Sequence, residues 1–132
     1  MKRLFVDTSA WYAYINAADP DHRRVEGALE SPESRLMTSN FVFDEVVTLC
    51  RYRLGHAAAV RAGRVLLDGG VLDLIRVTPE DEGSAWSIFQ RRRDEDYSFT
   101  DCTSFALMRR LGLRDAVALD ADFRREGFDV AP

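Results

Sequence analysis

Lysine is nearly absent from this chain of 132 residues: of its 18 basic residues, only Lys2 is a lysine. This absence excludes two classes of protein. A receiver domain that is phosphorylated on aspartate needs an acidic pair at its first strand and a lysine at its last. A phosphatase with an aspartyl nucleophile needs an Asp-x-Asp pair and, usually, a lysine. Here the first apolar segment is followed by Asp7-Thr8-Ser9, so neither chemistry has its residues.

Cysteine and histidine are also scarce. Two cysteines, Cys50 and Cys102, are too few for a disulfide framework or a thiolate zinc site, and we expect both to be buried and reduced. His22 and His56 lack the spacing of metal ligands, and neither is placed for serine or cysteine hydrolysis, so we expect surface positions. No glycine-rich phosphate loop is present.

Long apolar runs are missing as well. A membrane span needs about 18 consecutive apolar residues, and the first apolar run ends after three residues at Asp7. Hydrophobic residues make up 46% of the chain and charged residues 30%, which favours a packed core over disorder. We therefore expect one folded domain over residues 1–132 in a soluble, cytoplasmic protein. The net charge of −4 does not by itself indicate nucleic-acid binding.

Short apolar segments alternate with longer helical ones. Asp19, Asn40, Thr78 and Thr100 are the expected helix caps. The pattern predicts an α/β fold, a three-layer α/β/α sandwich with a mostly parallel sheet. The predicted strands are 3–6, 36–38, 71–77, 116–119 and 128–130. The predicted helices are 9–17, about 20–30, 41–54, 56–68 (ended by Gly69-Gly70), 79–92 and 101–111.

Acidic residues follow the predicted strands. Asp7 comes directly after the first strand, and Asp120 directly after the strand 116–119. Asp101 lies in the first turn of a helix, and Glu45 lies one turn into the helix that follows the second strand. Ligands of parallel sheets bind outside the carboxyl ends of the strands. We expect these four carboxylates to meet at that edge.

Glu45 stands in an apolar segment, FVFDEVVTLC, which predicts a largely buried helix. Helical spacing places Glu45 on one stripe with Phe41, Leu49 and Tyr52, and it places Arg51 and Arg53 on other faces. A buried carboxylate needs a partner or a metal. The alternative is that Glu45 reaches solvent near the start of its helix, where the helix dipole favours an acid.

Four converging carboxylates would repel one another strongly. Two unit charges 4 Å apart cost about 4 kcal/mol at an effective dielectric constant of 20, and several such pairs would rival the stability of a small domain. A divalent cation would relieve this repulsion. An all-oxygen ligand set selects Mg²⁺ or Mn²⁺ over zinc, and such a site suits phosphodiester hydrolysis.

Four motifs in order carry a resemblance over nearly the whole chain: VDTSAW (6–11), TSNFVFDE (38–45), YSFTDCTSFALM (97–108) and LDADF (119–123), with GF at 127–128. In these motifs the chain resembles PIN-domain ribonucleases, and among them the VapC-type toxins of toxin–antitoxin pairs. The resemblance implies a Mg²⁺- or Mn²⁺-dependent endoribonuclease that forms a homodimer and is inhibited by a cognate antitoxin.

The resemblance also implies roles for individual residues. Asp7, Asp101 and Asp120 would hold the metal, and Glu45 would complete the catalytic quartet by orienting or deprotonating the attacking water. A second tier comprises Thr8 and Ser9 beside Asp7, Asp96 at the rim, Thr100, and Asp122 as an alternative ligand. Many relatives lack an acid at the position of Asp122, and we favour Asp120 because it is predicted to end its strand.

Several alternatives stay open at this stage. The chain could be a housekeeping RNA-processing nuclease of the same fold, or a non-catalytic module that binds RNA or protein. The runs 91–93 and 109–110 could contact an RNA backbone or simply be solvated arginines. A groove between the first helix, rich in aromatic residues, and the helix 41–54 would suit an antitoxin helix.

Overall fold

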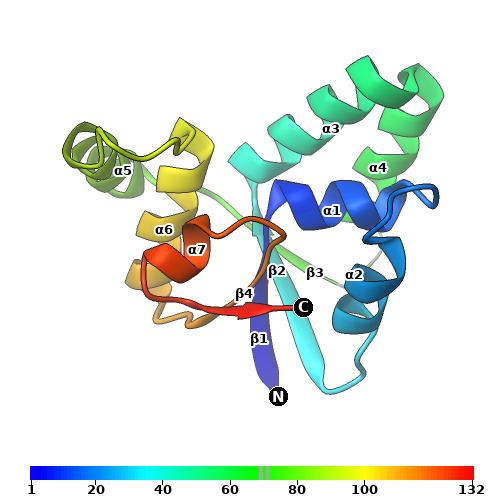
Figure 1. Ribbon diagram of the computed structural model, residues 1–132, viewed down its shortest axis with the longest axis horizontal. Coiled ribbons are helices and arrows are strands. Elements are labelled where there is room, and N and C mark those ends of the chain that lie inside the picture. Colours follow the sequence, from blue (N-terminus) through cyan, green and yellow to red (C-terminus); the bar gives the residue numbers. More distant parts are fainter. Residues whose placement is uncertain (69, 71) are drawn as a thin grey trace.

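The computed structural model describes residues 1–68, 70 and 72–132, and in them five strands form one sheet (Figure 1). The strand order is β3-β2-β1-β4-β5, and every neighbouring pair is parallel. The predicted sheet is therefore confirmed, and it is parallel throughout. The strands are β1 (Lys2–Val6), β2 (Ser34–Ser39), β3 (Leu72–Ile75), β4 (Asp115–Val117) and β5 (Asp129–Ala131).

Helices cover both faces of this sheet. Right-handed crossovers place the helices between β1 and β3 on one face and those after β3 on the other, and Figure 1 shows these two groups on opposite sides. The first group is α1 (Thr8–Ile15), α2 (His22–Leu29), α3 (Asn40–Leu54) and α4 (His56–Asp68). The second is α5 (Pro79–Arg91), α6 (Phe99–Leu111) and α7 (Asp122–Arg125).

The strand order creates one position where a ligand can bind. The chain builds β1, β2 and β3 outward in one direction, then crosses back to place β4 on the other side of β1. Connections leave the carboxyl ends of β1 and β4 toward opposite faces, which opens a crevice between them. The segments that follow these two strands carry Asp7 and Asp120.

The core lies between the sheet and its helices. Phe5, on β1, is fully buried, and its ring lies 6.4 Å from that of Phe123 on α7. Trp11 on α1 is buried too, and its indole N–H donates to the Thr38 hydroxyl on β2 at 3.2 Å. Core packing is thus the main role of Trp11. The two cysteines are buried and free, as predicted.

Three predicted helix caps are wrong. In α3 and α6 a neighbouring serine caps the helix instead, and α2 begins without a side-chain cap. Ser39, rather than Asn40, accepts from Val42 N–H, and Asn40 accepts from Val77 N–H beyond β3. Asp21 occupies the cap position of α2, because the Asp19 side chain accepts from the N–H of Asp21 in a turn that precedes the helix. Ser98 caps α6, in place of Thr100.

Several element boundaries also differ from the predictions, among them those of two strands. The strand predicted over 116–119 ends at Val117, because Leu119 N–H leaves the sheet and donates to the Ser9 hydroxyl. Asp120 therefore follows the strand only after two intervening residues, and α7 behind it was not predicted. The predicted strand 71–77 is observed as Leu72–Ile75. Gly69, expected as a helix stop, and Val71, expected as the first strand residue, lie outside the described residues.

The helix 41–54 is less buried than its composition predicts. Only Val42, Val46 and Cys50 of α3 are buried, and Tyr52 is 84% exposed. The reason is that the far half of α3 packs mainly on α4, in a hairpin that extends away from the sheet (Figure 1). No helix in the described residues is long and apolar enough to cross a membrane.

Candidate active site

Asp7 lies at the centre of the crevice, where β1 ends and α1 begins. It is only 2% exposed, and its Oδ1 atom has no hydrogen-bond partner among the described residues. Burial raises the pKa of this carboxyl well above its usual value, and the negative charges of Asp101, Asp120 and Glu45 raise it further. A buried, unpaired carboxylate oxygen is costly, so a feature of this kind points to a missing ligand.

Asp101 enters the crevice from the first turn of α6. A capping box holds it there: the Ser98 hydroxyl accepts from Asp101 N–H at 3.0 Å, and the Asp101 carboxylate accepts from Ser98 N–H at 2.9 Å. Burial raises the pKa of Asp101 to about 6, with a contribution from the charges of Asp120 and Asp122, although the hydrogen bonds of Ser98 act against the shift.

Asp120 and Asp122 come from the loop between β4 and α7. The Asp120 carboxylate accepts from Asp122 N–H at 3.1 Å. The Asp122 carboxylate accepts from the Arg125 guanidinium at 3.0 Å, whereas burial and the charge of Asp120 raise its pKa. Asp120 has no ion pair among the described residues. Of the two, Asp120 is thus the carboxylate left free for a ligand.

Ser9 connects two sides of the crevice. Its hydroxyl donates to Oδ2 of Asp7 at 3.3 Å and accepts from Leu119 N–H at 3.1 Å. The segment after β1 is thereby tied to the segment after β4. Thr8, next to it, is buried, and its hydroxyl oxygen has no partner within the described part of the chain. Two adjacent residues therefore present unpaired oxygen atoms at the same point.

Glu45 reaches the crevice from α3, half-buried and one and a half turns into the helix. Steps of four residues place Leu49 and then Arg53 on the same side, and both line the crevice with Glu45. The expectation that Arg53 lies on another face is therefore wrong. Tyr52, expected on the stripe of Glu45, instead lines a separate apolar hollow between α3 and α4.

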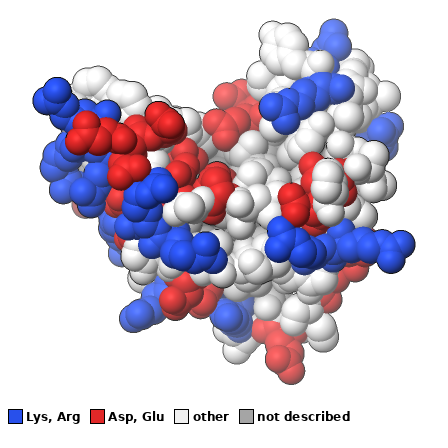
Figure 2. All heavy atoms as spheres, in the orientation of Figure 1, with Lys and Arg blue, Asp and Glu red and all other residues white. Residues whose placement is uncertain are grey.

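These residues share one open cavity of about 490 Å³. Figure 2 shows a notch between the α3–α4 side and the α5–α6 side of the molecule, with acidic atoms inside it. The four expected catalytic acids all line this cavity, so the tertiary structure brings them together. The lining residues are Asp7, Thr8, Ser9, Tyr12, Asp19, Glu45, Leu49, Arg53, Asp96, Ser98, Asp101, Leu119, Asp120 and Asp122.

The donor set fits a hard divalent cation. It consists of carboxylate and hydroxyl oxygens, and the unpaired atoms Asp7 Oδ1 and Thr8 Oγ1 supply two of them. Within the described residues, however, no three Asp, Glu, His or Cys side chains stand close enough together to hold a metal ion. Asp101 and Asp120 each accept a hydrogen bond from a backbone N–H of their own segment instead.

The second tier of predicted residues divides. Thr8, Ser9, Asp96 and Asp122 line the cavity, but Thr100 does not. The backbone carbonyl of Thr100 accepts from the hydroxyls of Thr103 and Ser104, one turn further along the helix. Ser98 takes the place expected for Thr100. The Ser-x-x-Asp spacing of a capping box, visible in the sequence, was the signal that could have identified it.

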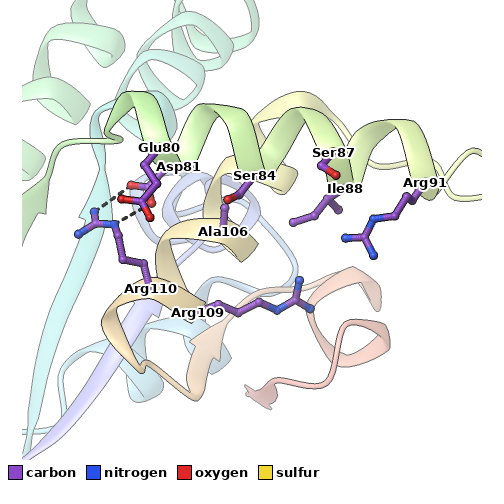
Figure 3. A pocket seen from close by; sticks show the side chains of 9 residues that line it. All are labelled: Glu80, Asp81, Ser84, Ser87, Ile88, Arg91, Ala106, Arg109 and Arg110. Carbon is purple, nitrogen blue, oxygen red and sulfur yellow. Dashed lines mark hydrogen bonds and ion pairs between the residues drawn. The ribbon is translucent and has the colours of Figure 1, made fainter.

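The arginines at 109–110 do not face this cavity. They line a groove of about 410 Å³ between α5 and α6, shown in Figure 3. Arg110 forms a two-pronged ion pair with Asp81 at 2.7 and 2.8 Å, and Arg109 contacts Glu126 at 3.0 Å. Both are therefore engaged in holding helices together. Of the predicted surface histidines, His56 is exposed, and His22 is half-buried against the Ala13 carbonyl.

Comparison with known proteins agrees with this geometry. Residues 4–128 match the sequence profile of the PIN domain family. The 23S rRNA-specific endonuclease VapC20 of Mycobacterium tuberculosis is 42% identical over 130 residues, which cover 98% of this chain and 98% of that protein. The chain belongs to the PIN-domain family, as a VapC-type member. The resemblance read from the four motifs is confirmed.

Solved PIN-domain structures confirm the fold. The crystal structure of M. tuberculosis VapC20, a sarcin–ricin loop cleaving toxin, superposes with a TM-score of 0.91 at 42% identity, covering 98% of this chain and 99% of that one. A toxin–antitoxin complex from Klebsiella pneumoniae reaches 0.67 at 12% identity, covering 98% and 96%. At that identity the second match supports only the α/β/α fold.

Proposed function

We propose that this chain is a divalent-metal-dependent endoribonuclease, the toxin of a toxin–antitoxin pair, built as one PIN-like domain over residues 1–132. One observation carries the proposal. In a VapC-type chain, Asp7, Glu45, Asp101 and Asp120 line a single cavity at the crevice between β1 and β4. An alternative housekeeping nuclease would use the same chemistry, and a module that only binds would gain nothing from the electrostatic cost of these acids.

Asp7, Asp101 and Asp120 are the proposed ligands of Mg²⁺ or Mn²⁺. The unpaired Oδ1 of Asp7, the raised pKa values of Asp7 and Asp101, and the free carboxylate of Asp120 support this assignment. When bound, the cation supplies a Lewis acid that activates water and screens charge on the phosphodiester. Asp122 is assigned to the rim, because Arg125 occupies its carboxylate.

The remaining residues of the site have positioning or proton-transfer roles. Glu45 lines the cavity from α3, and we assign it to orient the attacking water and accept its proton. Ser9 keeps Asp7 in register with the loop after β4 through its two hydrogen bonds. The free hydroxyl of Thr8 is the proposed partner of a water beside the cation.

The proposed substrate is a ribosomal RNA stem-loop, in the cytoplasm where ribosomes work. Support comes from the 42% identity to an endonuclease specific for 23S rRNA, over nearly the full length of both chains. The proposed partner is a cognate antitoxin, because the chain is of the VapC type and solved VapBC structures and a toxin–antitoxin complex share its fold. The expected antitoxin surface is the side of the cavity that α1 and α3 line.

The test is cleavage of purified ribosomes and of total RNA by the isolated protein. Three conditions are compared: with Mn²⁺, with EDTA, and with Asp7→Asn in Mn²⁺. We expect discrete fragments of the large ribosomal RNA in the first condition alone. Equal cleavage in EDTA would remove the metal from the proposal. Absence of cleavage by folded, antitoxin-free protein on both substrates would defeat the ribonuclease assignment.

A homodimer is part of the proposal, with α5 as the contact. Trp86 and Phe89 are 54% and 41% exposed and lie on one flank of α5, between Glu82 near its start and Arg93 just beyond its end. A two-fold axis through the middle of the helix would place Trp86 against Phe89 of the second copy. The same axis would place Glu82 against Arg93, so the flank is complementary to itself.

Sedimentation equilibrium tests this contact. We expect Glu82→Arg and Arg93→Glu each to weaken dimerisation, and the double variant to restore it, because the charge pair is re-formed with reversed signs. Trp86→Glu should give a monomer. A dimer of unchanged strength in all of these variants would place the contact elsewhere on the molecule.

A further inference from the structure

The cavity is electrostatically one-sided. Its lining contains seven acidic residues and a single basic one. A bound cation would offset the charges at the Asp7 end only, yet the proposed substrate is a polyanion that must extend beyond the scissile bond. The acidic residues are Asp7, Asp19, Glu45, Asp96, Asp101, Asp120 and Asp122, and the basic residue is Arg53.

Arg53 stands at the far end of this cavity. It lies eight residues after Glu45 on α3, about 12 Å along the helix axis, and beside it Tyr12 of α1 lines the same wall. The Arg53 guanidinium carbon lies 5.3 Å from the centroid of the Tyr12 ring, a cation–π contact. This contact favours a guanidinium placed over the ring and leaves its N–H groups available.

Arg53 differs from the arginines of this chain that are held by an acid. Arg35, Arg92, Arg109, Arg110 and Arg125 each form an ion pair with an acid. Arg53 is exposed and forms no ion pair with any residue that the structure describes, although it borders seven acids. An oriented guanidinium without a carboxylate partner at the end of an open groove is available to bind an external anion.

We propose that Arg53, held by Tyr12, binds a phosphate of the RNA that flanks the scissile one, on the α1–α3 side of the cavity. This inference rests on the proposed ribonuclease function and adds a substrate-binding subsite to it. The planar fork of arginine binds two phosphate oxygens at once, whereas an ammonium group binds as a point charge. RNA strands that proteins read are commonly held by arginine and aromatic planes together.

Steady-state cleavage kinetics test the subsite. Arg53→Ala should raise KM about tenfold and change kcat less than twofold, because the contact holds the strand and does not touch the reacting atoms. Arg53→Lys should recover part of the loss, since charge returns without the fork. The matched control is Arg51→Ala, because Arg51 lies two residues earlier and lines the hollow between α3 and α4 instead.

Salt dependence provides a readout that a structural role would not move. Each phosphate contact on a single strand contributes about 0.7 to the slope of log affinity against log salt. We expect Arg53→Ala to reduce this slope by about 0.7 and Arg51→Ala to leave it unchanged. The measurement uses a fluorescent RNA stem-loop and protein carrying Asp7→Asn, so that the RNA stays intact during binding.

Tyr12 variants test the proposed stacking. Tyr12→Phe keeps the ring and should leave KM near that of the wild type, whereas Tyr12→Leu should raise it severalfold. The Tyr12 hydroxyl has only a long contact of 3.5 Å with the Asn16 side chain, so its removal is a mild change. Equal effects of the two substitutions would contradict the role of the ring.

The outcomes separate this inference from the function on which it rests. Unchanged KM and salt slope in Arg53→Ala, with an active wild type, overturn the subsite and leave the ribonuclease intact. An equal loss in Arg51→Ala also overturns it, because any surface charge would then serve. An inactive wild type that still loses salt-dependent RNA binding on Arg53→Ala overturns the nuclease and retains the phosphate site.

Discussion

Two aspartates of this chain occupy the same local motif and behave in opposite ways. Asp81 and Asp101 each stand third in a helix, in capping boxes closed by Thr78 and Ser98. Both are nearly buried, with 2% and 9% of their surface exposed. The hydrogen bonds of Arg110 lower the pKa of Asp81, however, whereas burial raises the pKa of Asp101 to about 6.

The difference lies in what faces each carboxylate from the neighbouring element. Arg110 of α6 reaches back to α5 and holds both oxygens of Asp81, as Figure 3 shows. Asp101 faces Asp120 and Asp122 instead. A capping box therefore positions an acid, but the tertiary partner decides whether that acid stabilises the fold or is left free to bind a ligand. Asp81 belongs to the first kind, and we assign Asp101 to the second.

The largest expected difference between Asp81 and Asp101 is in the rate of RNA cleavage when each is replaced by asparagine. We expect Asp101→Asn to lower the rate of cleavage in Mn²⁺ by a hundredfold or more, because a charged ligand is lost. Asp81→Asn should leave it within about threefold. Cleavage assays at matched protein concentration, with circular dichroism as a folding check, measure both. Similar losses in the two variants would erase the distinction.

The two acids should also affect the pH dependence of stability differently. Ionisation of Asp101 should lower the free energy of unfolding by about 3 kcal/mol. In metal-free protein the pKa of Asp101 is about 6 in the fold and 3.8 in the unfolded chain, so ionisation opposes folding. This cost is absent below about pH 4, grows as the pH rises, and is complete above about pH 6. Urea unfolding in EDTA from pH 4 to pH 7 measures it.

The control for the pH series is Asp101→Asn, which should lose less stability than the wild type between those limits. Added Mg²⁺ or Mn²⁺ should restore stability to the wild type at pH 7 and much less to the variant. The contribution of Asp81 to the pH dependence of stability has the opposite sign, because its pKa is lowered and the stability that it contributes disappears as the pH falls. Identical pH profiles in wild type and Asp101→Asn would mean that Asp101 is not strained by its surroundings.

Removal of Arg110 should reveal the cost of burying the Asp81 carboxylate without its ion-pair partner. We expect Arg110→Met to lower the free energy of unfolding by about 2 kcal/mol, a value reduced because the Arg110 side chain is 32% exposed. The double variant with Asp81→Asn should be less destabilised than the sum of the two single variants. Urea unfolding of all four proteins closes the cycle, and additive losses would show that the pair is not coupled.

Removal of the Thr78 cap and of the Ser98 cap should have similar effects on stability but different effects on RNA cleavage. Thr78→Ala and Ser98→Ala should each cost about 1 kcal/mol, because each leaves one N–H of a helix start without its acceptor. Only Ser98→Ala should slow RNA cleavage, severalfold, because Ser98 positions Asp101. Thermal unfolding and cleavage rates measured side by side decide this, and equal slowing by both would contradict a local positioning role.

Much of the fold could be predicted from local pattern. The alternation of apolar strands and helices predicted five strands, six of the seven helices and a parallel sheet, because side-chain periodicity and glycine stops act over a few residues. Caps were less predictable. Ser39, Asn40, Ser98 and Thr100 are all capable caps, and the three-dimensional course of the chain chooses between neighbours. The short helix α7 consists of about one turn, which is too short to show helical periodicity in the sequence.

In the candidate site, too, some residues could be predicted from local sequence and others could not. Asp7, Glu45, Asp101 and Asp120 were predicted to lie together from their places after strands and in early helical turns, and they line one cavity. Arg53 was missed, because the cavity that it lines is formed by residues far apart in the sequence, on α1, α3, α6 and the loop after β4. The pairing of Arg110 with Asp81 could not be read from the sequence either, since 29 residues separate the two.

The sequence by itself determined the order of the elements, the resemblance to VapC-type PIN domains and the acids at the strand ends. These follow from periodicity and from motifs a few residues long. Only the tertiary structure decided which acids face an arginine, as Asp81 does, and which face other acids, as Asp101 does. That choice depends on crossovers that place β4 beside β1 and α6 against α5, and no local pattern records which distant side chains such crossovers bring together.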